Sequence, residues 1–187
     1  MLTRVLVAIL LAASAHAAIA QNTSDDWAWD YYSDEGAGEF YLFAGTVNDE
    51  DRFLGKYCDI LSGECAYLVT QNISCSSGDK YPVLVSLGSE AVSTNLVCWD
   101  EFDTNEWAYE IEAWDTLDSS IISAKRMGIV VALVDGTFSV SRFSLLGSGA
   151  MISEMETVLE EVLAELSQNP KSTAKPSDSI DNDSTIL

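Results

Sequence analysis

The sequence has little positive charge and almost no histidine. Its 187 residues include 9 lysines and arginines against 30 aspartates and glutamates, and the one histidine is His16. Such a chain lacks the basic surface by which proteins hold the phosphates of DNA or RNA, so we expect no nucleic-acid partner. After residue 20, no apolar run approaches the ~20 residues that span a bilayer.

Residues 1–20 have the three regions of a secretory signal peptide. Arg4 is basic, Val5 to Ala13 are apolar, and small residues precede possible cleavage after Ala17 or Ala20. We therefore expect a periplasmic or secreted protein without membrane insertion after signal cleavage. Cleavage removes Arg4, which takes the formal charge from −21 to −22, and it removes His16. Without an imidazole, the mature chain has no Ser-His-Asp triad, no Cys-His dyad and no histidine metal ligand.

An even number of cysteines in an exported chain indicates disulfide bonds. The four cysteines allow three pairings, of which we favour Cys58–Cys65 together with Cys75–Cys98. A Ser-Gly turn signal between Cys58 and Cys65 lets that loop close. Cys75 lies in a polar loop and Cys98 ends an alternating strand. A zinc site is the alternative, but the spacing lacks CxxC pairs.

The hydrophobic pattern divides the chain into four parts. Residues 1–20 form the signal peptide, 21–37 an acidic flexible lead-in, 38–168 a single domain, and 169–187 a disordered tail without a core-forming pattern. The lead-in is rich in tryptophan, tyrosine and aspartate without a clear period.

Within the domain, strand and helix patterns follow one another. Residues 106–112 alternate aromatic or aliphatic side chains with acidic ones, which predicts a half-buried antiparallel strand. Residues 115–126 predict a short helix that ends before Gly128. Met151 to Leu166 have apolar residues at helical spacing and predict a long amphipathic helix. The fold class we predict is α+β, an antiparallel sheet with one short and one long amphipathic helix, linked by disulfides.

Two stretches of the sequence resemble the invasion-associated locus B family of exported bacterial proteins. Phe53-Leu-Gly-Lys-Tyr-Cys58, followed by Cys65-Ala-Tyr-Leu-Val69, is similar to the family's strand, cysteine, loop, cysteine, strand opening. The second stretch, from Leu117 to Met155, contains Phe143-Ser-Leu-Leu-Gly147 before a helix, which resembles the family's closing segment. The resemblance implies an exported, disulfide-bonded, β-rich module for host or envelope interaction. It implies no catalytic residue.

Acidic residues are the main candidates for chemistry. Asn48, Asp49 and Asp51 form a short oxygen-rich loop that is a weak calcium candidate, because it lacks the spacing of an EF-hand. Four further acids lie near aromatic residues and could serve a glycan hydrolase, which needs two carboxyl groups ~5–9.5 Å apart. They are Asp100, Asp103, Glu110 and Glu112. A solvated acidic surface explains the same residues.

These observations favour a non-enzymatic module that binds another molecule outside the cytoplasm. The charge of −22 creates a field that attracts cationic partners, so we expect a basic protein partner and no cofactor. The alternative is a hydrolase that uses only carboxylates and acts on a glycan. It predicts a cleft in which two acids lie close together and one has a raised pKa.

Overall fold

The computed structural model describes residues 22–34, 39–103, 106–112 and 114–168, without the side chains at 22, 33, 34, 39 and 100–103. The predicted signal peptide at 1–20 and the predicted tail at 169–187 lie outside these ranges. Both assignments, and the division of the chain into domains, therefore stay predictions. Among the described residues, no helix has the length and apolar character that a membrane span requires.

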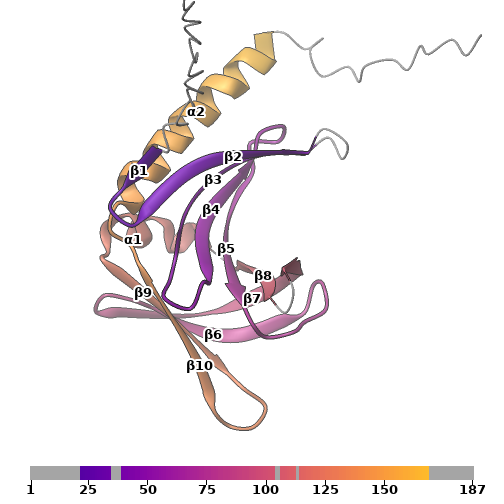
Figure 1. Cartoon of the computed structure of the whole chain (residues 1–187), viewed down its shortest axis with the longest axis vertical. Coiled ribbons are helices and arrows are strands. Elements are labelled where there is room, and N and C mark those ends of the chain that lie inside the picture. Colours follow the sequence, from indigo (N-terminus) through magenta and orange to yellow (C-terminus); the bar gives the residue numbers. More distant parts are fainter. Residues whose placement is uncertain (1–21, 35–38, 104–105, 113, 169–187) are drawn as a thin grey trace, which may run out of the picture.

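Ten strands form one antiparallel sheet, which is strongly curved (Figure 1). The strand order is β1-β2-β3-β4-β5-β8-β7-β6-β9-β10, so most neighbours in the sheet are also neighbours in sequence. The bounds are β1 Asn22–Ser24, β2 Trp27–Asp34, β3 Glu39–Val47, β4 Phe53–Asp59, β5 Cys65–Gln71, β6 Lys80–Leu87, β7 Glu90–Asp103, β8 Glu106–Ile111, β9 Arg126–Ala132 and β10 Phe138–Ser144.

The prediction of a two-helix α+β fold is wrong, because the described chain is mostly sheet. Its one helix of seven residues or more is α2, Ser148–Gln168. The expected short helix is reduced to a 3-10 turn at Trp114–Thr116 and the six-residue α1, Asp118–Ser123. One local effect and one pairing with a distant strand shorten it. No side chain caps its start, and Arg126, expected in its last turn, instead pairs with Ser144 as the first residue of β9.

The prediction of a flexible lead-in is also wrong over its described part. Residues 22–24 and 27–34 form β1 and β2, and β2 pairs with β3 from Ala28 to Asp34. Trp27 explains why this segment is held, since its side chain is 1% exposed and its Nε1 donates to Ser144 O at 2.9 Å. Burial of a large aromatic ring with a satisfied N–H outweighs the poor periodicity of the segment.

Alternate residues of each strand divide the sheet into two faces. The core face carries Leu42 of β3, Lys56 of β4, Tyr67 of β5 and Ile129 of β9, all buried. We call the opposite side the open face; it carries Tyr41 and Tyr57. In β8 the predicted alternation is confirmed, because Tyr109 and Ile111 are buried while Glu110 is exposed.

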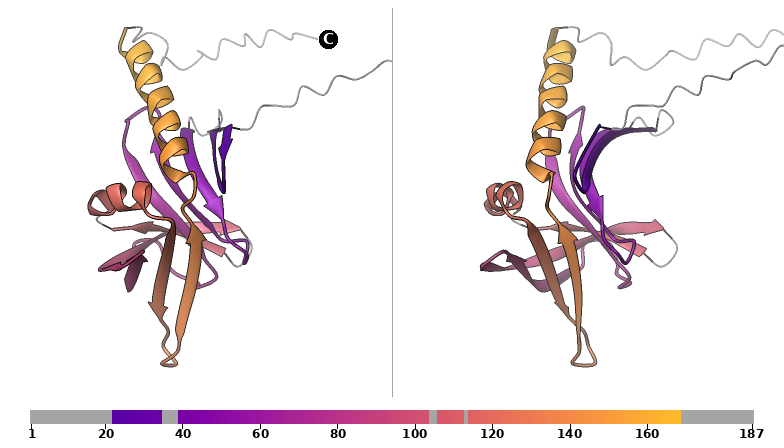
Figure 2. Two further views of the ribbon diagram at one scale, coloured as in Figure 1. Left: turned by 90° about the vertical axis from the view of Figure 1, so that its left-hand side faces the viewer. Right: turned by 60° about the vertical axis from the view of Figure 1, so that its left-hand side comes forward.

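Both helices pack on the core face (Figure 2). Helix α2 contacts β1, β2 and β3 and also touches α1. Its Met151, Ile152, Met155 and Leu159 belong to the same hydrophobic core as the strand residues, and Val158 and Leu163 pack at the edge of that core. The predicted apolar stripe of this helix is therefore confirmed for its first three turns.

Candidate functional site

The structure contains disulfides Cys58–Cys65 and Cys75–Cys98, the pairing that the sequence favoured. Cys58 and Cys65 lie directly opposite each other in β4 and β5, with 4.1 Å between their Cα atoms. Cys75 belongs to the loop after β5 and ties it to Cys98 in β7. Disulfides persist in oxidising compartments, so this pair of bonds fits a location outside the cytoplasm.

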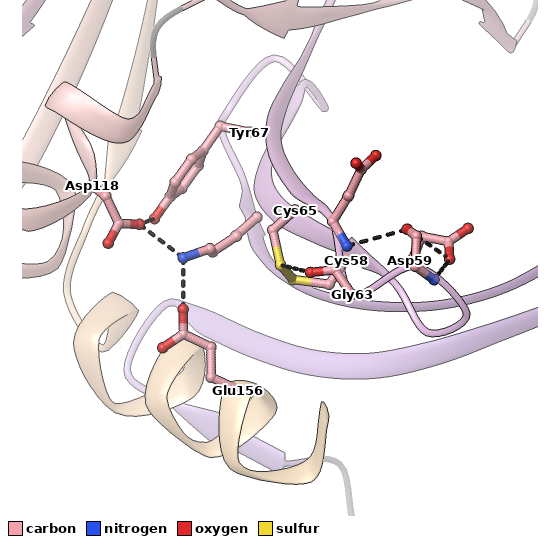
Figure 3. Close-up of a disulfide and its surroundings, with 10 residues drawn as sticks. Cys58, Asp59, Gly63, Cys65, Tyr67, Asp118 and Glu156 are labelled. Carbon is pink, nitrogen blue, oxygen red and sulfur yellow. Dashed lines mark hydrogen bonds and ion pairs between the residues drawn. A yellow bond between two sulfur atoms is a disulfide. The ribbon is translucent and has the colours of Figure 1, made fainter. Parts of the chain in front are cut away.

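A buried lysine links the sheet to both helices. Lys56 Nζ lies 2.9 Å from Asp118 Oδ1 at the start of α1 and 2.6 Å from Glu156 Oε1 on α2. The Tyr67 hydroxyl donates to the same Asp118 oxygen at 2.9 Å. Figure 3 shows Asp118 and Glu156 approaching this point from different sides, with Tyr67 beside Asp118. The ammonium also lies 5.3 Å from the centre of the Trp114 ring, within cation–π range.

This arrangement keeps the lysine charged. Burial lowers the pKa of Lys56, but the hydrogen bonds and charges of Glu156 and Asp118 outweigh burial and raise it above the ordinary 10.5. Burial, with the nearby Asp118 charge, raises the pKa of Tyr67. A protonated ammonium and a neutral phenol are neither nucleophiles nor bases at neutral pH. The cluster therefore fastens the helices to the sheet and supplies neither a nucleophile nor a base at neutral pH.

Only two of the four acids proposed as a hydrolase site have described side chains, so the site stays a prediction. Asp100 and Asp103 lie in β7, but their side chains fall outside the description. Glu110 is exposed on the open face. Hydrogen bonds from Lys80 and Asn95 lower the pKa of Glu112 below its ordinary value. Glu112 is therefore ionised at neutral pH, whereas a general acid needs a raised pKa.

The calcium candidate loop lies between β3 and β4. Asn48 Oδ1 accepts hydrogen bonds from the backbone N–H groups of Glu50 and Arg52 at 3.0 and 2.9 Å, so this oxygen already stabilises the turn. Asp49 and Asp51 are exposed. Across the described ranges, no three acidic, cysteine or histidine side chains are placed to hold a metal ion together.

An open hollow of about 320 Å³ lies beside this loop. It is lined by Glu50, Asp51, Arg52, Asn72 and Glu106. Of the hydrolase candidates, Glu110 and Glu112 have described side chains, and neither lines the hollow. Arg52 is held there by Glu50 at 3.1 Å and by the Gln71 and Ser141 side chains at 2.9 and 2.6 Å. Its guanidinium thus connects the start of β4 to β5 and β10 and stabilises the sheet there.

The open face carries a continuous row of aromatic rings that the sequence analysis did not single out. We call Tyr32, Tyr41, Tyr57 and Trp99 the aromatic strip. Neighbouring ring centres are 6.4, 4.7 and 5.1 Å apart in that order. The two ends are the most accessible, with Tyr32 52% and Trp99 41% exposed. Alternation within β3 and β4 could have placed the tyrosines on one face, but no local pattern reveals that Trp99 of β7 reaches Tyr57 of β4.

Comparison with known proteins shows similarity at the level of the fold. No protein-family model matches the sequence, and no curated protein matches it either. Among solved structures, the chain is similar to invasion associated protein B from Bartonella henselae, with a TM-score of 0.52 and 11% sequence identity. The match covers 75% of this chain and 97% of that protein. At this identity the likeness concerns the fold, and in the fold it confirms the weak resemblance found in the two sequence stretches.

Proposed function

We propose that this chain is an exported, non-enzymatic binding module that recognises a basic protein partner. The observation that carries the proposal is the uneven distribution of charge over the described surface. From β1 to β8 the chain has three bases, Arg52, Lys56 and Lys80, and each is ion-paired with an acid of the same chain. The more numerous carboxylates of this region dominate its surface field, which favours encounter with cations.

The positive charges that are exposed lie elsewhere. Lys125, Arg126 and Arg142 are all exposed, and they gather around the start of β9 and the end of β10. The molecule therefore has an acidic part, from β2 to β8, and a smaller part with exposed bases. A partner with a basic surface would be attracted to the acidic part and repelled by the part with exposed bases. This gives the encounter a preferred orientation.

The fold similarity supports the same proposal without carrying it. The structural neighbour is described as an invasion associated protein, which is a name for a process and not for a reaction. No contact in the described residues favours the alternative of a glycan hydrolase, and the lowered pKa of Glu112 leaves it unsuited to the role of general acid.

The test uses a basic probe whose lysine charges can be reversed by acylation. The exported chain is titrated with lysozyme, which is basic, and with the same lysozyme after succinylation of its lysines. We expect the basic form to bind at low salt and to weaken steeply with added salt, and we expect no binding of the succinylated form. Equal binding of both forms, or binding of neither, would contradict the proposal.

Variants of the chain supply the matched control. Replacing the exposed acids Asp30 and Glu110 by Asn and Gln should weaken binding of lysozyme. Replacing the exposed bases Lys125 and Arg126 by Gln should leave it unchanged or strengthen it. If both pairs of variants weaken binding equally, the acidic part of the surface is not where the partner binds.

A further inference from the structure

The aromatic strip is built into the sheet by features on both of its faces. Tyr32 and Tyr41 are direct partners in the β2–β3 register, and their rings stack at 9°. Tyr57 of β4 is the diagonal neighbour of Tyr41 on the same face, because Tyr41 is opposite Asp59 and Tyr57 is opposite Phe43. Trp99 sits at a register irregularity between Cys98 and Asp100, where β7 departs from regular pairing with β8. Such a bulge changes the direction in which a side chain points. Here the Trp99 ring contacts Tyr57 of β4, although β5 and β8 lie between the two strands.

The two disulfides hold the residues next to the strip. Cys58 follows Tyr57 in β4, and Cys98 precedes Trp99 in β7, with both cysteines buried on the core face. Because successive side chains of a strand point to opposite faces, each disulfide fixes the backbone under an aromatic ring of the open face. The rings at this end of the strip are thus preorganised, which lowers the entropy that a ligand must remove on binding.

Small residues leave the neighbouring surface flat and aromatic. Gly45 and Gly55 face each other in β3 and β4, and the Phe53 ring lies over both. A Cβ at either glycine would collide with that ring. Phe53 also meets Phe43 edge-on, with ring centres 6.4 Å apart. The strip therefore continues into a second aromatic pair on the same face.

The charges around the strip are negative. Asp30 is opposite Phe43, Asp59 is opposite Tyr41, and Glu110 is opposite Leu68, all at open-face positions of the register. Asp30 and Glu110 are exposed and Asp59 is half-buried. Lys80 of β6 also lies on this face, and its ammonium is paired with Glu112. Exposed aromatic rings bordered by carboxylates suit a cation that is flat enough to stack.

We propose that the aromatic strip is the binding site for an extended, arginine-bearing segment of a basic protein. This proposal rests on the function proposed above and names the place and the chemistry of recognition. Guanidinium groups stack on the faces of Tyr32 and Trp99, the two most exposed rings, while Asp30 and Glu110 pair with their N–H groups. Helices α1 and α2 pack on the opposite face, so neither described helix competes for these rings.

A neutral glycan also stacks on exposed aromatic rings, and the test must separate the two ligands. The exported chain is labelled with nitrogen-15 and titrated at low salt with an Arg-Gly repeat peptide, a Glu-Gly repeat peptide and a neutral chito-oligosaccharide. We expect the arginine peptide alone to shift the indole N–H signal of Trp99. We also expect the combined variant Tyr32→Ala with Trp99→Ala to bind it about tenfold more weakly, since two cation–π contacts are lost.

Phe138→Ala is the matched control, because Phe138 is 67% exposed on the same face but lies in β10, away from the strip. It should leave the dissociation constant unchanged. A thermal melt of each variant checks that it folds, and Asp30→Asn with Glu110→Gln offers a second route to weaker binding that removes no ring.

The outcomes separate this inference from the proposed function. Salt-sensitive binding of lysozyme and peptide that survives loss of Tyr32 and Trp99 overturns the strip as the site and leaves the basic-partner proposal standing. Failure of both probes to bind the parent chain overturns both. A shift of Trp99 with the chito-oligosaccharide, and none with the arginine peptide, overturns the choice of ligand.

Discussion

Lys56 and Tyr57 are neighbours in β4, and they show how differently the two faces of the sheet are built. Lys56 is 4% exposed on the core face and is held by two carboxylates and two aromatic rings. Tyr57 lies on the open face among rings that end in exposed Tyr32 and Trp99. On the core face a cation of the chain already occupies an aromatic and acidic environment. The open face carries exposed aromatic rings, Tyr32 and Trp99, together with the exposed carboxylates of Asp30 and Glu110.

Stability and binding should therefore depend on different faces of the sheet. Side chains of the core face are covered by α2 and α1, so their loss should mainly lower the free energy of unfolding. Side chains of the open face make few buried contacts at the ends of the strip, so their loss should mainly lower affinity. Variants on each face test whether stability or affinity is lost.

The largest effect is expected from Leu159→Ala in α2. Leu159 is 6% exposed in the core, and truncation of a buried leucine costs about 2–5 kcal/mol of unfolding free energy. Urea denaturation of variant and parent measures the loss. Leu166→Ala, half-buried near the end of the helix, should cost clearly less. Equal midpoints for Leu159→Ala and the parent would show that α2 is not docked on the sheet.

The double variant Cys75→Ser with Cys98→Ser tests whether the disulfide on the core face holds the Trp99 ring in place on the open face. Its loop spans 23 residues, and opening it should cost about 3 kcal/mol on the chain-entropy model. The adjacent Trp99 should also lose its fixed position, which would broaden its indole N–H signal. Opening Cys58–Cys65, a loop of sequence separation 7, should cost less, about 2.5 kcal/mol. A sharp, unshifted Trp99 signal without the first bond would contradict its role in holding the strip.

Lys56→Met removes the cation that joins the helices to the sheet. Breaking a fully buried pair costs about 3–5 kcal/mol, but Asp118 and Glu156 keep partial contact with solvent, so we expect about 2 kcal/mol. The pKa of Lys56 is raised above 10.5, so its contribution is present below that pH and is lost as the pH rises through the folded value. The pKa of Tyr67 shifts in the same direction.

Variant and parent should therefore differ most at neutral pH and converge in strong alkali. Measuring the unfolding free energy from pH 7 to pH 11 tests this. A difference that stays constant over the whole range would mean that Lys56 contributes packing and not charge.

The sequence predicts the parts of this molecule that depend on local chemistry. Cysteine spacing favoured the observed pairing, alternation at 106–112 assigned the faces of β8, and the period of α2 identified Met155 and Leu159 as core residues. Prediction from the sequence failed where contacts between distant residues determine the secondary structure. Trp27 makes β2 part of the sheet through a hydrogen bond to Ser144, and pairing of Arg126 with Ser144 ends the short helix early.

The aromatic strip could not be predicted for the same reason. Tyr32, Tyr41 and Tyr57 come from three consecutive strands, and their common face follows from register alone. Trp99 joins them only because β8 and β7 follow β5 in the sheet and β7 is irregular at Cys98. Strand order and irregular pairing are set by the whole sheet, and no window of the sequence contains them.

The smallest effect is expected on the open face, where Lys80 pairs with Glu112. Hydrogen bonds from Lys80 and Asn95 lower the pKa of Glu112, so its contribution is present above the ordinary value of 4.5 and is lost as the pH falls through the folded value. Exposed pairs of this kind add little to stability. Glu112→Gln should thus change the unfolding midpoint slightly at neutral pH and flatten only the acid side of the stability profile.

Glu110→Gln is the control for Glu112→Gln, because Glu110 is exposed two positions earlier in the same run of acids. It should weaken binding of the arginine peptide, and Glu112→Gln should leave that binding unchanged, since Glu112 is already paired with Lys80. If both variants weaken the peptide equally, the acidic face acts through its total charge. If only Glu110→Gln does so, the open face has a local site beside the aromatic strip.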